Sequence, residues 1–214
     1  MKIGIGIDTG GTYTDAVLYD FDADEVLGTA KALTTREDLS KGILAALDRL
    51  PPEALAQASV LSLSTTLATN ACVENKGGRA KLAFFGGNRK VIDELGGKYG
   101  LPPADEILLE EGGLSELDGA AILEMNAMNN GGRIEKQARD IVREFFDIPV
   151  VCGHELFSEL NCLQRGASTL LNAQLLPVIE EFLAAIRTAM DRRGLHPSTV
   201  IVRSDGSLMS EAFA

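Results

Sequence analysis

The chain has 214 residues, of which 45% are hydrophobic, so it is long enough for one large domain or two small ones. Its formal net charge of −11 leaves no basic stripe for a phosphate backbone, which argues against a nucleic-acid partner. No apolar run approaches the ~20 residues of a membrane span, and Asp8 comes too early for a secretory signal, so we expect a cytoplasmic protein with no membrane partner.

Three strands are predicted in succession at the N-terminus, over residues 2–8, 13–20 and 25–32. In the first strand three isoleucines alternate with two glycines, so the isoleucines share one face and the glycines permit close approach on the other. A tight turn joins the first two strands into a hairpin, with the sequence Asp8-Thr9-Gly10-Gly11-Thr12-Tyr13-Thr14-Asp15.

This turn has the composition of an anion site. Gly10 and Gly11 allow a positive φ and leave no Cβ between the backbone N–H groups and a bound anion. Hydroxyl donors come from Thr9, Thr12 and Thr14, and successive N–H groups of a turn form an anion-binding nest. A carboxylate beside a phosphate cradle usually handles the accompanying Mg²⁺, which makes Asp8 the candidate metal ligand. The turn therefore predicts phosphate binding, and the alternative is a plain tight turn of small polar residues.

The following elements complete a first lobe. Thr35-Arg36-Glu37-Asp38 is similar to a capping box and predicts a helix that Pro51 and Pro52 end. A buried strand, a helix and another strand are expected next, over residues 60–63, 65–75 and 81–85. This order is that of a ribonuclease-H-like lobe, and it favours an α/β fold whose mixed sheet is covered by helices on both faces. We place this phosphate-binding lobe at residues 1–87.

Residues 88–214 are interpreted as a second α/β part. Its predicted helices cover residues 89–97, 134–146 and 160–193, and its predicted strands cover residues 120–125, 150–152 and 200–202. Pro177 should kink or split the long helix, and Gly194 should end it. Residues 100–113 and 126–132 are expected to be loops.

Cysteine and histidine give little sign of chemistry. Cys72, Cys152 and Cys162 form no C-x-x-C pair and each lies next to apolar residues, which predicts buried thiols. No His or Lys motif accompanies them, so a catalytic thiol is not favoured. His154 and His196 are the only histidines, and we interpret both as structural.

The hairpin is neither a Walker loop nor a Rossmann fingerprint, because no Gly-Lys-Ser/Thr follows and the glycines lead into a strand. It resembles the Asp-x-Gly-Gly-Thr-Phe-Thr-Asp of the hydantoinase A / 5-oxoprolinase family, within the actin-like ATPase superfamily. Three later segments resemble that family in the same order, at residues 64–71, 164–173 and 203–210. Ser64, Gln164 and Gly166 depart from the family's pattern, and the shorter middle section is similar to the compact branch.

This resemblance implies ATP and Mg²⁺ as cofactors. Asp8 and Asp15 would be the catalytic carboxylates that organise metal and water. Phosphate or substrate contacts would come from Thr9, Gly10, Gly11, Thr12, Thr14, Thr65, Thr66, Asn70, Arg165 and Asn172. The implied protein is the N-terminal part of an ATP-dependent amidohydrolase, or of a related carboxylase subunit. It would act on a cyclic amide or ketone, as an oligomer and often with a B-type partner subunit.

Other functions remain open at this point. A small-molecule kinase of the same fold and a non-enzymatic nucleotide-sensing module would both use the hairpin. A metal-dependent nuclease could use Asp8, Asp15 and Asp20, but the acidic charge opposes it. The sequence has no second Asp-Gly-Gly-Thr, so we expect a fragment of a two-lobed protein that hydrolyses ATP weakly or not at all by itself.

Overall fold

The computed structural model describes residues 2–74, 76–110, 132–157, 161–203 and 205–211. The chain divides into two compact units, one made of Met1–Lys76 with Pro177–Ala214 and the other of Gly77–Leu176. This division differs from the predicted boundary at residue 87, because residues 77–87 go with the second unit and residues 177–214 return to the first. A single helix, α8 (Cys162–Arg192), supplies residues to both units.

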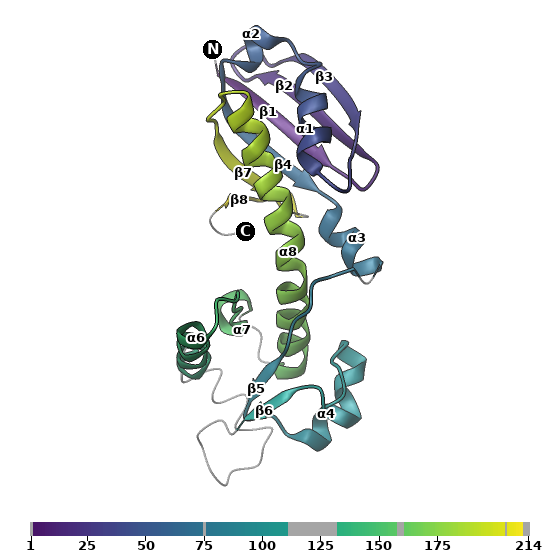
Figure 1. Cartoon of the computed structure of the whole chain (residues 1–214), viewed down its shortest axis with the longest axis vertical. Helices are drawn as coiled ribbons and strands as arrows, with labels where there is room; N and C mark the ends of the chain where they lie inside the picture. The colour runs from purple at the N-terminus through teal and green to yellow at the C-terminus, as the bar shows by residue number, and fades with distance from the viewer. Residues whose placement is uncertain (1, 75, 111–131, 158–160, 204, 212–214) are drawn as a thin grey trace. The chain divides into compact units, whose positions relative to one another are not determined.

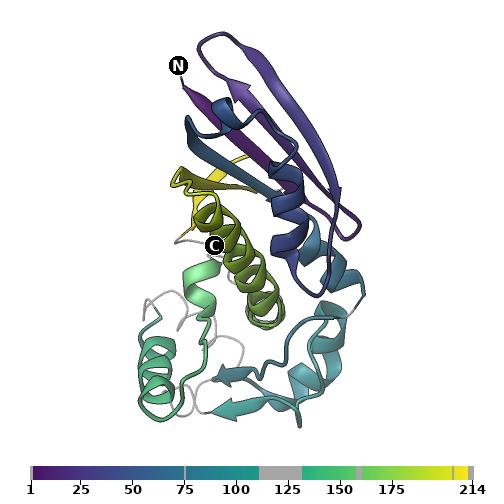
Figure 2. The same cartoon turned by 45° about the horizontal axis from the view of Figure 1, so that its top comes forward.

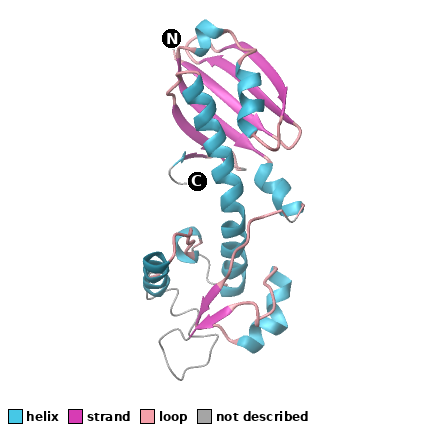
Figure 3. Cartoon of the chain, viewed as in Figure 1, coloured by secondary structure: helices cyan, strands magenta, loops and turns pink. Residues whose placement is uncertain are grey.

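The first unit is built on a six-stranded mixed sheet in the order β3-β2-β1-β4-β7-β8 (Figures 1 and 3). Its strands are β1 (Ile3–Thr9), β2 (Tyr13–Asp20), β3 (Glu25–Leu33), β4 (Ala58–Thr65), β7 (Ser198–Val202) and β8 (Leu208–Ser210). The first three strands pair antiparallel, whereas β4 runs parallel to β1 and β7 runs parallel to β4. The predicted α/β fold with a mixed sheet is therefore confirmed, in the ribonuclease-H-like strand order.

One strand of this sheet was assigned wrongly. The segment expected to add the next strand of the first lobe is β5 (Ala83–Phe85), and it pairs with β6 (Leu108–Glu110) in a separate parallel sheet of the second unit. The place beside β4 is taken by β7, from the end of the chain. A short apolar run identifies a buried strand but not its partner, so periodicity alone could not distinguish the two arrangements.

The core of the first unit lies on one face of its sheet. Ile3, Ile5 and Ile7 of β1 are at most 2% exposed, and burying each such side chain stabilises the fold by about 1.5–3 kcal/mol. Helix α1 (Leu39–Leu47) and the C-terminal part of α8 pack on this face (Figures 1 and 2), where they bury Ile43 and Phe182. In the described part of the chain, these two helices cover one face and not both as expected.

Helix α1 begins three residues later than the expected capping box. Its N-cap is Asp38, whose carboxylate accepts hydrogen bonds from the Ser40 N–H at 3.1 Å and from the Ser40 hydroxyl at 2.5 Å. These hydrogen bonds lower the pKa of Asp38. The short helices α2 (Pro52–Leu55) and α3 (Leu67–Val73) follow, the latter inside the predicted range of 65–75.

The second unit has its own smaller core around β5 and the N-terminal part of α8. Its other elements are α4 (Arg89–Leu95), the 3₁₀ helix η1 (Gly96–Tyr99), α6 (Arg133–Phe145) and α7 (Gly153–Leu156). No strand forms at residues 150–152, where one was predicted. The loop expected at 100–113 is described only as far as residue 110, and this part contains β6 as well as loop. The strand expected at 120–125 and the loop residues 126–131 lie outside the described residues.

Helix α8 runs through Pro177 without splitting there, although a proline removes one helical hydrogen bond. The division between the two units falls at this residue instead. Among the described helices α8 is long and apolar enough for a membrane span by length and composition, which is weak evidence because core helices pass the same test. It buries Leu163 and Leu170 in the second core, and Phe182 and Ile186 in the first.

The cysteines are less buried than predicted. Cys152 is buried, Cys162 is half-buried and Cys72 on α3 is exposed, and none of the three forms a disulfide. The expectation of buried thiols is therefore wrong for Cys72. Of its two apolar neighbours in sequence, Ala71 is buried, whereas Val73 is 82% exposed like the thiol beside it.

Candidate functional site

The hairpin turn between β1 and β2 presents two unused backbone amides. The register places Asp8 opposite Asp15 and Thr9 opposite Thr14, which leaves residues 10–12 as the loop. The Gly10 N–H donates to the Tyr13 carbonyl at 2.9 Å and so closes the turn. Within the described residues, the N–H groups of Gly11 and Thr12 make no hydrogen bond. One of the three loop amides therefore serves the protein itself, and two are available to a ligand.

Neither glycine of this turn has the positive φ that was expected. Their lack of a side chain serves close approach instead. A Cβ on Gly11 would lie 3.2 Å from Asn70 Nδ2 and 3.7 Å from Arg36 Nη2, and a Cβ on Gly10 would lie 3.6 Å from Thr66 Oγ1. Three polar side chains thus gather at the two glycines.

The side chains of Arg36, Thr66 and Asn70 come from two parts of the chain, the segment after β3 and the start of α3 after β4. Thr66 is the N-cap of α3 and its hydroxyl makes no capping bond, while Asn70 lies within the same helix. Arg36 follows β3, and its Nε donates to the Gly11 carbonyl at 3.4 Å. Because the Thr34 N–H bonds to the Thr12 carbonyl at 2.9 Å, the end of β3 is held against the turn. Thr66 and Asn70 were predicted, whereas Arg36 was missed because it was interpreted as part of a capping box.

Two of the predicted threonine donors point away from the surface. Thr9 and Thr14 are fully buried, with 0% exposure. The Thr14 hydroxyl lies 3.1 Å from the Thr34 hydroxyl, and the buried Thr9 Oγ1 makes no hydrogen bond in the described structure. This placement argues against direct contact between either hydroxyl and a ligand outside the hairpin. Side chains of odd and even residues alternate between the two faces of a strand, and these two fall on the core face.

Thr65 has a structural use. Its hydroxyl donates to the Thr9 carbonyl at 2.7 Å and accepts from the Leu67 N–H at 3.0 Å, so it joins the end of β4 to the end of β1. Thr12 and Thr66 are the predicted threonines whose side chains are exposed beside the loop. The hydroxyl donors of the candidate site are therefore fewer than the sequence predicted.

The two aspartates of the hairpin differ in their partners. Asp15 forms an ion pair with Lys31 of β3 at 2.9 Å, and the Lys31 ammonium also lies 5.0 Å from the centre of the Tyr13 ring. Asp8 is exposed, and among the described residues its carboxylate makes no ion pair or hydrogen bond. The carboxylate with free oxygens is thus the one predicted to bind metal.

Both aspartates line an open depression of about 320 Å³ on the face of the sheet opposite the core. Strands β1 to β4 all contribute to its lining, which consists of Gly6, Ile7, Asp8, Asp15, Ala16, Val17, Thr29, Ala30, Ser62 and Ser64. The small side chains of β1 and β4 make room here, as the glycines of the first strand predicted. The depression combines carboxylates, hydroxyls and aliphatic walls.

Three parallel strands bring distant segments to the same edge of this sheet. The carboxyl ends of β1, β4 and β7 lead into the hairpin loop, into the start of α3, and into the turn before β8. In that last turn the Asp205 carboxylate accepts from the Ser207 N–H at 2.9 Å and from its hydroxyl at 2.6 Å. Ligands of open α/β sheets commonly bind at the carboxyl ends of the strands.

Arg165 and Asn172 belong to the second unit, on α8. The Asn172 amide donates to the Ser168 carbonyl at 2.9 Å, and Arg165 packs close to Gly153. Gly166, which departs from the family pattern, has a packing reason, because a Cβ there would lie 2.8 Å from the Phe84 ring. The assignment of Arg165 and Asn172 as ligand contacts stays a prediction.

Comparison with known proteins finds a family whose model covers the hairpin and the start of α3. A model of the hydantoinase/oxoprolinase N-terminal region matches residues 4–100, which include the hairpin and the start of α3. Residues 4–100 are thus similar to the hydantoinase/oxoprolinase N-terminal region. The resemblance that the motifs carried is thereby confirmed.

Two curated relatives align with nearly the whole chain. The caprolactamase subunit alpha of Pseudomonas jessenii is 27% identical over 248 residues, covering 95% of this chain and 36% of that protein. The acetophenone carboxylase gamma subunit of Aromatoleum aromaticum is 26% identical over 259 residues, covering 94% of this chain and 35% of that protein. The chain thus spans about a third of the length of these relatives.

Two solved structures share the fold. Nucleotide-free acetone carboxylase superimposes with a TM-score of 0.70 and 20% identity, over 97% of this chain and 37% of that one. The ATP-dependent caprolactamase from Pseudomonas jessenii gives a TM-score of 0.68 and 24% identity, over 96% and 36%. At these identities the structures establish a shared α/β fold.

Proposed function

We propose that the β1–β2 hairpin binds the phosphates of ATP, and that the chain is the N-terminal portion of an ATP-dependent hydantoinase/oxoprolinase-type subunit. One observation carries the proposal: the two unused amides of Gly11 and Thr12 lie beside three side-chain donors, Arg36, Thr66 and Asn70. Anions bind where backbone N–H groups converge, and an arginine adds charge and a second pair of donors.

The residues present fit a magnesium ion as well. Mg²⁺ in nucleotide sites is held by one or two carboxylates together with waters and phosphate oxygens. The Asp8 carboxylate makes no hydrogen bond or ion pair with the described residues, whereas the Asp15 carboxylate is already paired with Lys31. We therefore assign Asp8 to the metal and Asp15 to positioning Lys31 beside the depression. When bound, MgATP supplies a phosphoryl group that can activate a carbonyl oxygen, and the chain's own groups hold and neutralise it.

For the reaction we propose ATP-dependent hydrolysis of a cyclic amide C–N bond, as in the relative named caprolactamase. Carboxylation of a ketone is the second candidate, because the relative named acetophenone carboxylase gamma subunit matches almost equally well. Both relatives are named as subunits, which supports a partner subunit for this protein. We propose that this partner is of the B type and that the oligomer is cytoplasmic. The depression beside Asp8 and Asp15 is the place for the substrate near the phosphates.

Equilibrium binding of MgATP to the full chain tests the phosphate assignment. Arg36→Ala removes a charge-assisted hydrogen bond of about 1.5–3 kcal/mol, so its Kd should rise by roughly 10–100-fold. Asn70→Ala removes a neutral donor and should raise the Kd several-fold. Arg89→Ala, an exposed arginine at the start of α4, is the matched control and should bind as the parent does. Equal affinity of the Arg36 variant and this control would refute the hairpin site.

The reaction class is tested with the full-length protein and its partner subunit. ATP-dependent ring opening of a lactam in the absence of bicarbonate identifies a hydrolase. Phosphate release that requires both a ketone and bicarbonate identifies a carboxylase. Phosphoryl transfer to a stable substrate phosphate would instead identify a small-molecule kinase, and nucleotide-dependent association without turnover would identify a sensing module.

A further inference from the structure

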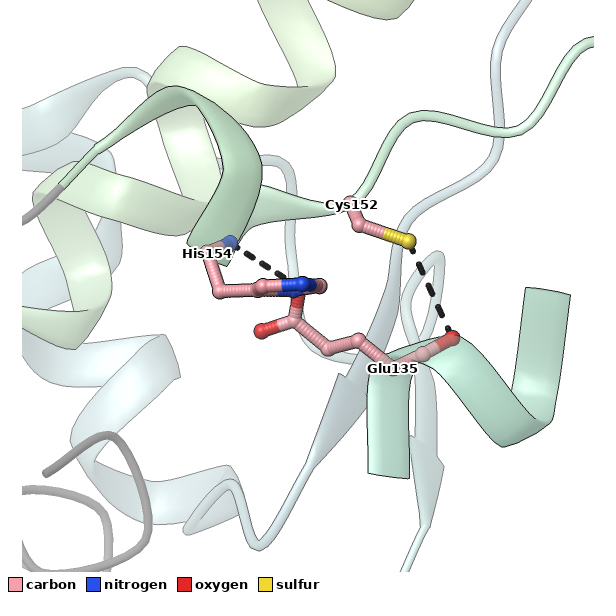
Figure 4. A group of neighbouring side chains, drawn as sticks. All are labelled: Glu135, Cys152 and His154. Carbon is pink, nitrogen blue, oxygen red and sulfur yellow. Dashed lines mark hydrogen bonds and ion pairs between the residues drawn. The ribbon is translucent and has the colours of Figure 1, made fainter. Parts of the chain in front are cut away.

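Three potential metal ligands converge in the second unit, far in sequence from the hairpin. Glu135 lies in the first turn of α6, Cys152 ends the segment before α7, and His154 lies within α7 (Figure 4). One ligand atom of each side chain lies within 4.8 Å of the other two. Carboxylate, thiolate and imidazole are the three side-chain groups that proteins use to bind Zn²⁺.

The cluster is withdrawn from solvent. Cys152 is 3% exposed, and the side chains of His154 and Glu135 are 17% and 26% exposed. Glu135 Oε2 lies 2.8 Å from His154 Nδ1 and also accepts the His154 backbone N–H at 3.1 Å. The other ring nitrogen, Nε2, is buried and makes no hydrogen bond with the described residues. Buried polar atoms normally have a partner, and the nearest carboxylate to Nε2, that of Glu155, lies 3.9 Å away, beyond hydrogen-bond distance.

We propose that Glu135, Cys152 and His154 form a Zn²⁺ site with an open fourth position. The charges balance when the metal binds, because a carboxylate and a thiolate together neutralise one divalent cation. On binding, the Cys152 S–H bond breaks, its proton passes to solvent, and the sulfur forms the bond to the metal. Nothing in this site depends on nucleotide binding at the hairpin.

The observed spacing requires only small movements. Ligand atoms about 2.0–2.3 Å from a tetrahedral Zn²⁺ lie roughly 3.3–3.7 Å apart, so the Glu135–His154 pair opens slightly and the sulfur approaches. With three protein ligands, the fourth position is left for water or substrate, as in catalytic rather than closed structural zinc sites.

Two glycines hold the ligands at this distance. A Cβ on Gly132, the N-cap of α6, would lie 2.1 Å from the His154 ring, so the imidazole rests directly on the backbone there. A Cβ on Gly153, between the two ligands Cys152 and His154, would lie 2.8 Å from Thr169 Oγ1 of α8. The ligand segment is therefore packed against α6 on one side and α8 on the other.

A nucleophilic thiol is the competing interpretation, and the geometry is against it. The Cys152 sulfur donates weakly to the Glu135 backbone carbonyl at 3.8 Å, not to a ring nitrogen of His154. Burial and the nearby carboxylates of Glu155 and Glu135 raise the pKa of this thiol, which disfavours the thiolate that a nucleophile needs. Arg139 lowers the pKa of the thiol by less than burial and the two carboxylates raise it, and its guanidinium pairs with Glu155 at 2.8 Å.

Titration of the metal-free full chain with Co²⁺ and Zn²⁺ tests the site. Co²⁺ should bind in equimolar amount, give a thiolate charge-transfer band and the intense visible bands of tetrahedral coordination, and be displaced by Zn²⁺. Cys152→Ser should abolish the charge-transfer band. His154→Gln and Glu135→Gln should each weaken Zn²⁺ binding by more than about 100-fold, beyond the 10–100-fold effect of an outer-shell partner.

The chain offers a matched control for each ligand. Cys72→Ser removes an exposed thiol, His196→Gln removes the other histidine, and Glu144→Gln removes an exposed carboxylate of the same helix α6. These three variants should bind as the parent does. Circular dichroism of each variant without metal shows whether it is folded, and Cys152→Ala serves if the serine variant is not. Unchanged Zn²⁺ affinity in the ligand variants, or octahedral Co²⁺ spectra without a charge-transfer band, would overturn the proposal.

Discussion

Replacing Asp8 with asparagine tests whether its carboxylate is a ligand group or a structural one. Asp8 and Asp15 are opposite each other in the β1–β2 register, where paired Cβ atoms lie roughly 5 Å apart. Two unit charges at that distance repel by about 0.8 kcal/mol in water, and by about 0.4 kcal/mol at physiological ionic strength. Asp8 has no compensating ion pair within the described structure, but Lys31 offsets part of the charge of Asp15, so Asp8→Asn should raise the free energy of unfolding by at most about 0.4–0.8 kcal/mol. For a chain of this size that is roughly 1–3 °C in Tm.

Thermal unfolding with and without MgATP, at low and at 1 M salt, separates the two roles. The gain from Asp8→Asn should shrink at high salt, and MgATP should raise the Tm of the parent more than that of the variant. Asp15→Asn is the comparison: it relieves the same repulsion but loses the Lys31 ion pair, which is 59% and 46% exposed and worth about 0.2–1 kcal/mol. Its net effect should be near zero. A loss of more than about 1 kcal/mol in Asp8→Asn would show a structural role and refute the ligand assignment.

Two further pairs of substitutions follow from the structure, both measured by urea unfolding. Thr9→Val removes a buried hydroxyl that has no partner among the described residues, so it should stabilise the fold by about 1 kcal/mol. Thr14→Val breaks the hydroxyl pair with Thr34 and should destabilise the fold by about 0.5–1.5 kcal/mol. Changes of the same sign in the two variants would contradict the observed bonding. Gly42→Ala should destabilise by about 1–3 kcal/mol despite its better helix propensity, because its Cβ would lie 2.8 Å from the Leu33 carbonyl oxygen. Gly97→Ala meets no atom within 4 Å and should be close to neutral.

Local features of the first lobe could be predicted because the sequence encodes them over short distances. Alternating isoleucines and glycines in residues 3–7 fix which face of β1 is buried, and two glycines between two strand patterns fix the hairpin. Thr66 and Asn70 were found because residues 64–71 resemble a motif of the hydantoinase A / 5-oxoprolinase family, at the end of a strand that leads into a helix. The fold class follows from the order of these elements.

Long-range features could not be predicted in the same way. The partner of β5 depends on β6, a strand of three residues with no alternation, and β7 reaches the first sheet only after the whole second unit. The cluster of Glu135, Cys152 and His154 joins residues up to 19 positions apart, and its cysteine was assigned to a strand that does not form. Neither spacing nor periodicity predicts that such distant residues meet, although the sequence does show Cys152 and His154 two positions apart.

The arrangement of strands explains why separate motifs act as one site. Parallel pairing of β1 with β4 brings the hairpin loop next to the start of α3, and the antiparallel return of β3 brings Arg36 to the same loop. Hydrogen bonds fix both approaches: Thr65 Oγ1 to the Thr9 carbonyl, and the Thr34 N–H to the Thr12 carbonyl. Donors held in this way by the sheet lose little conformational freedom when an anion binds, so more of their interaction energy contributes to affinity.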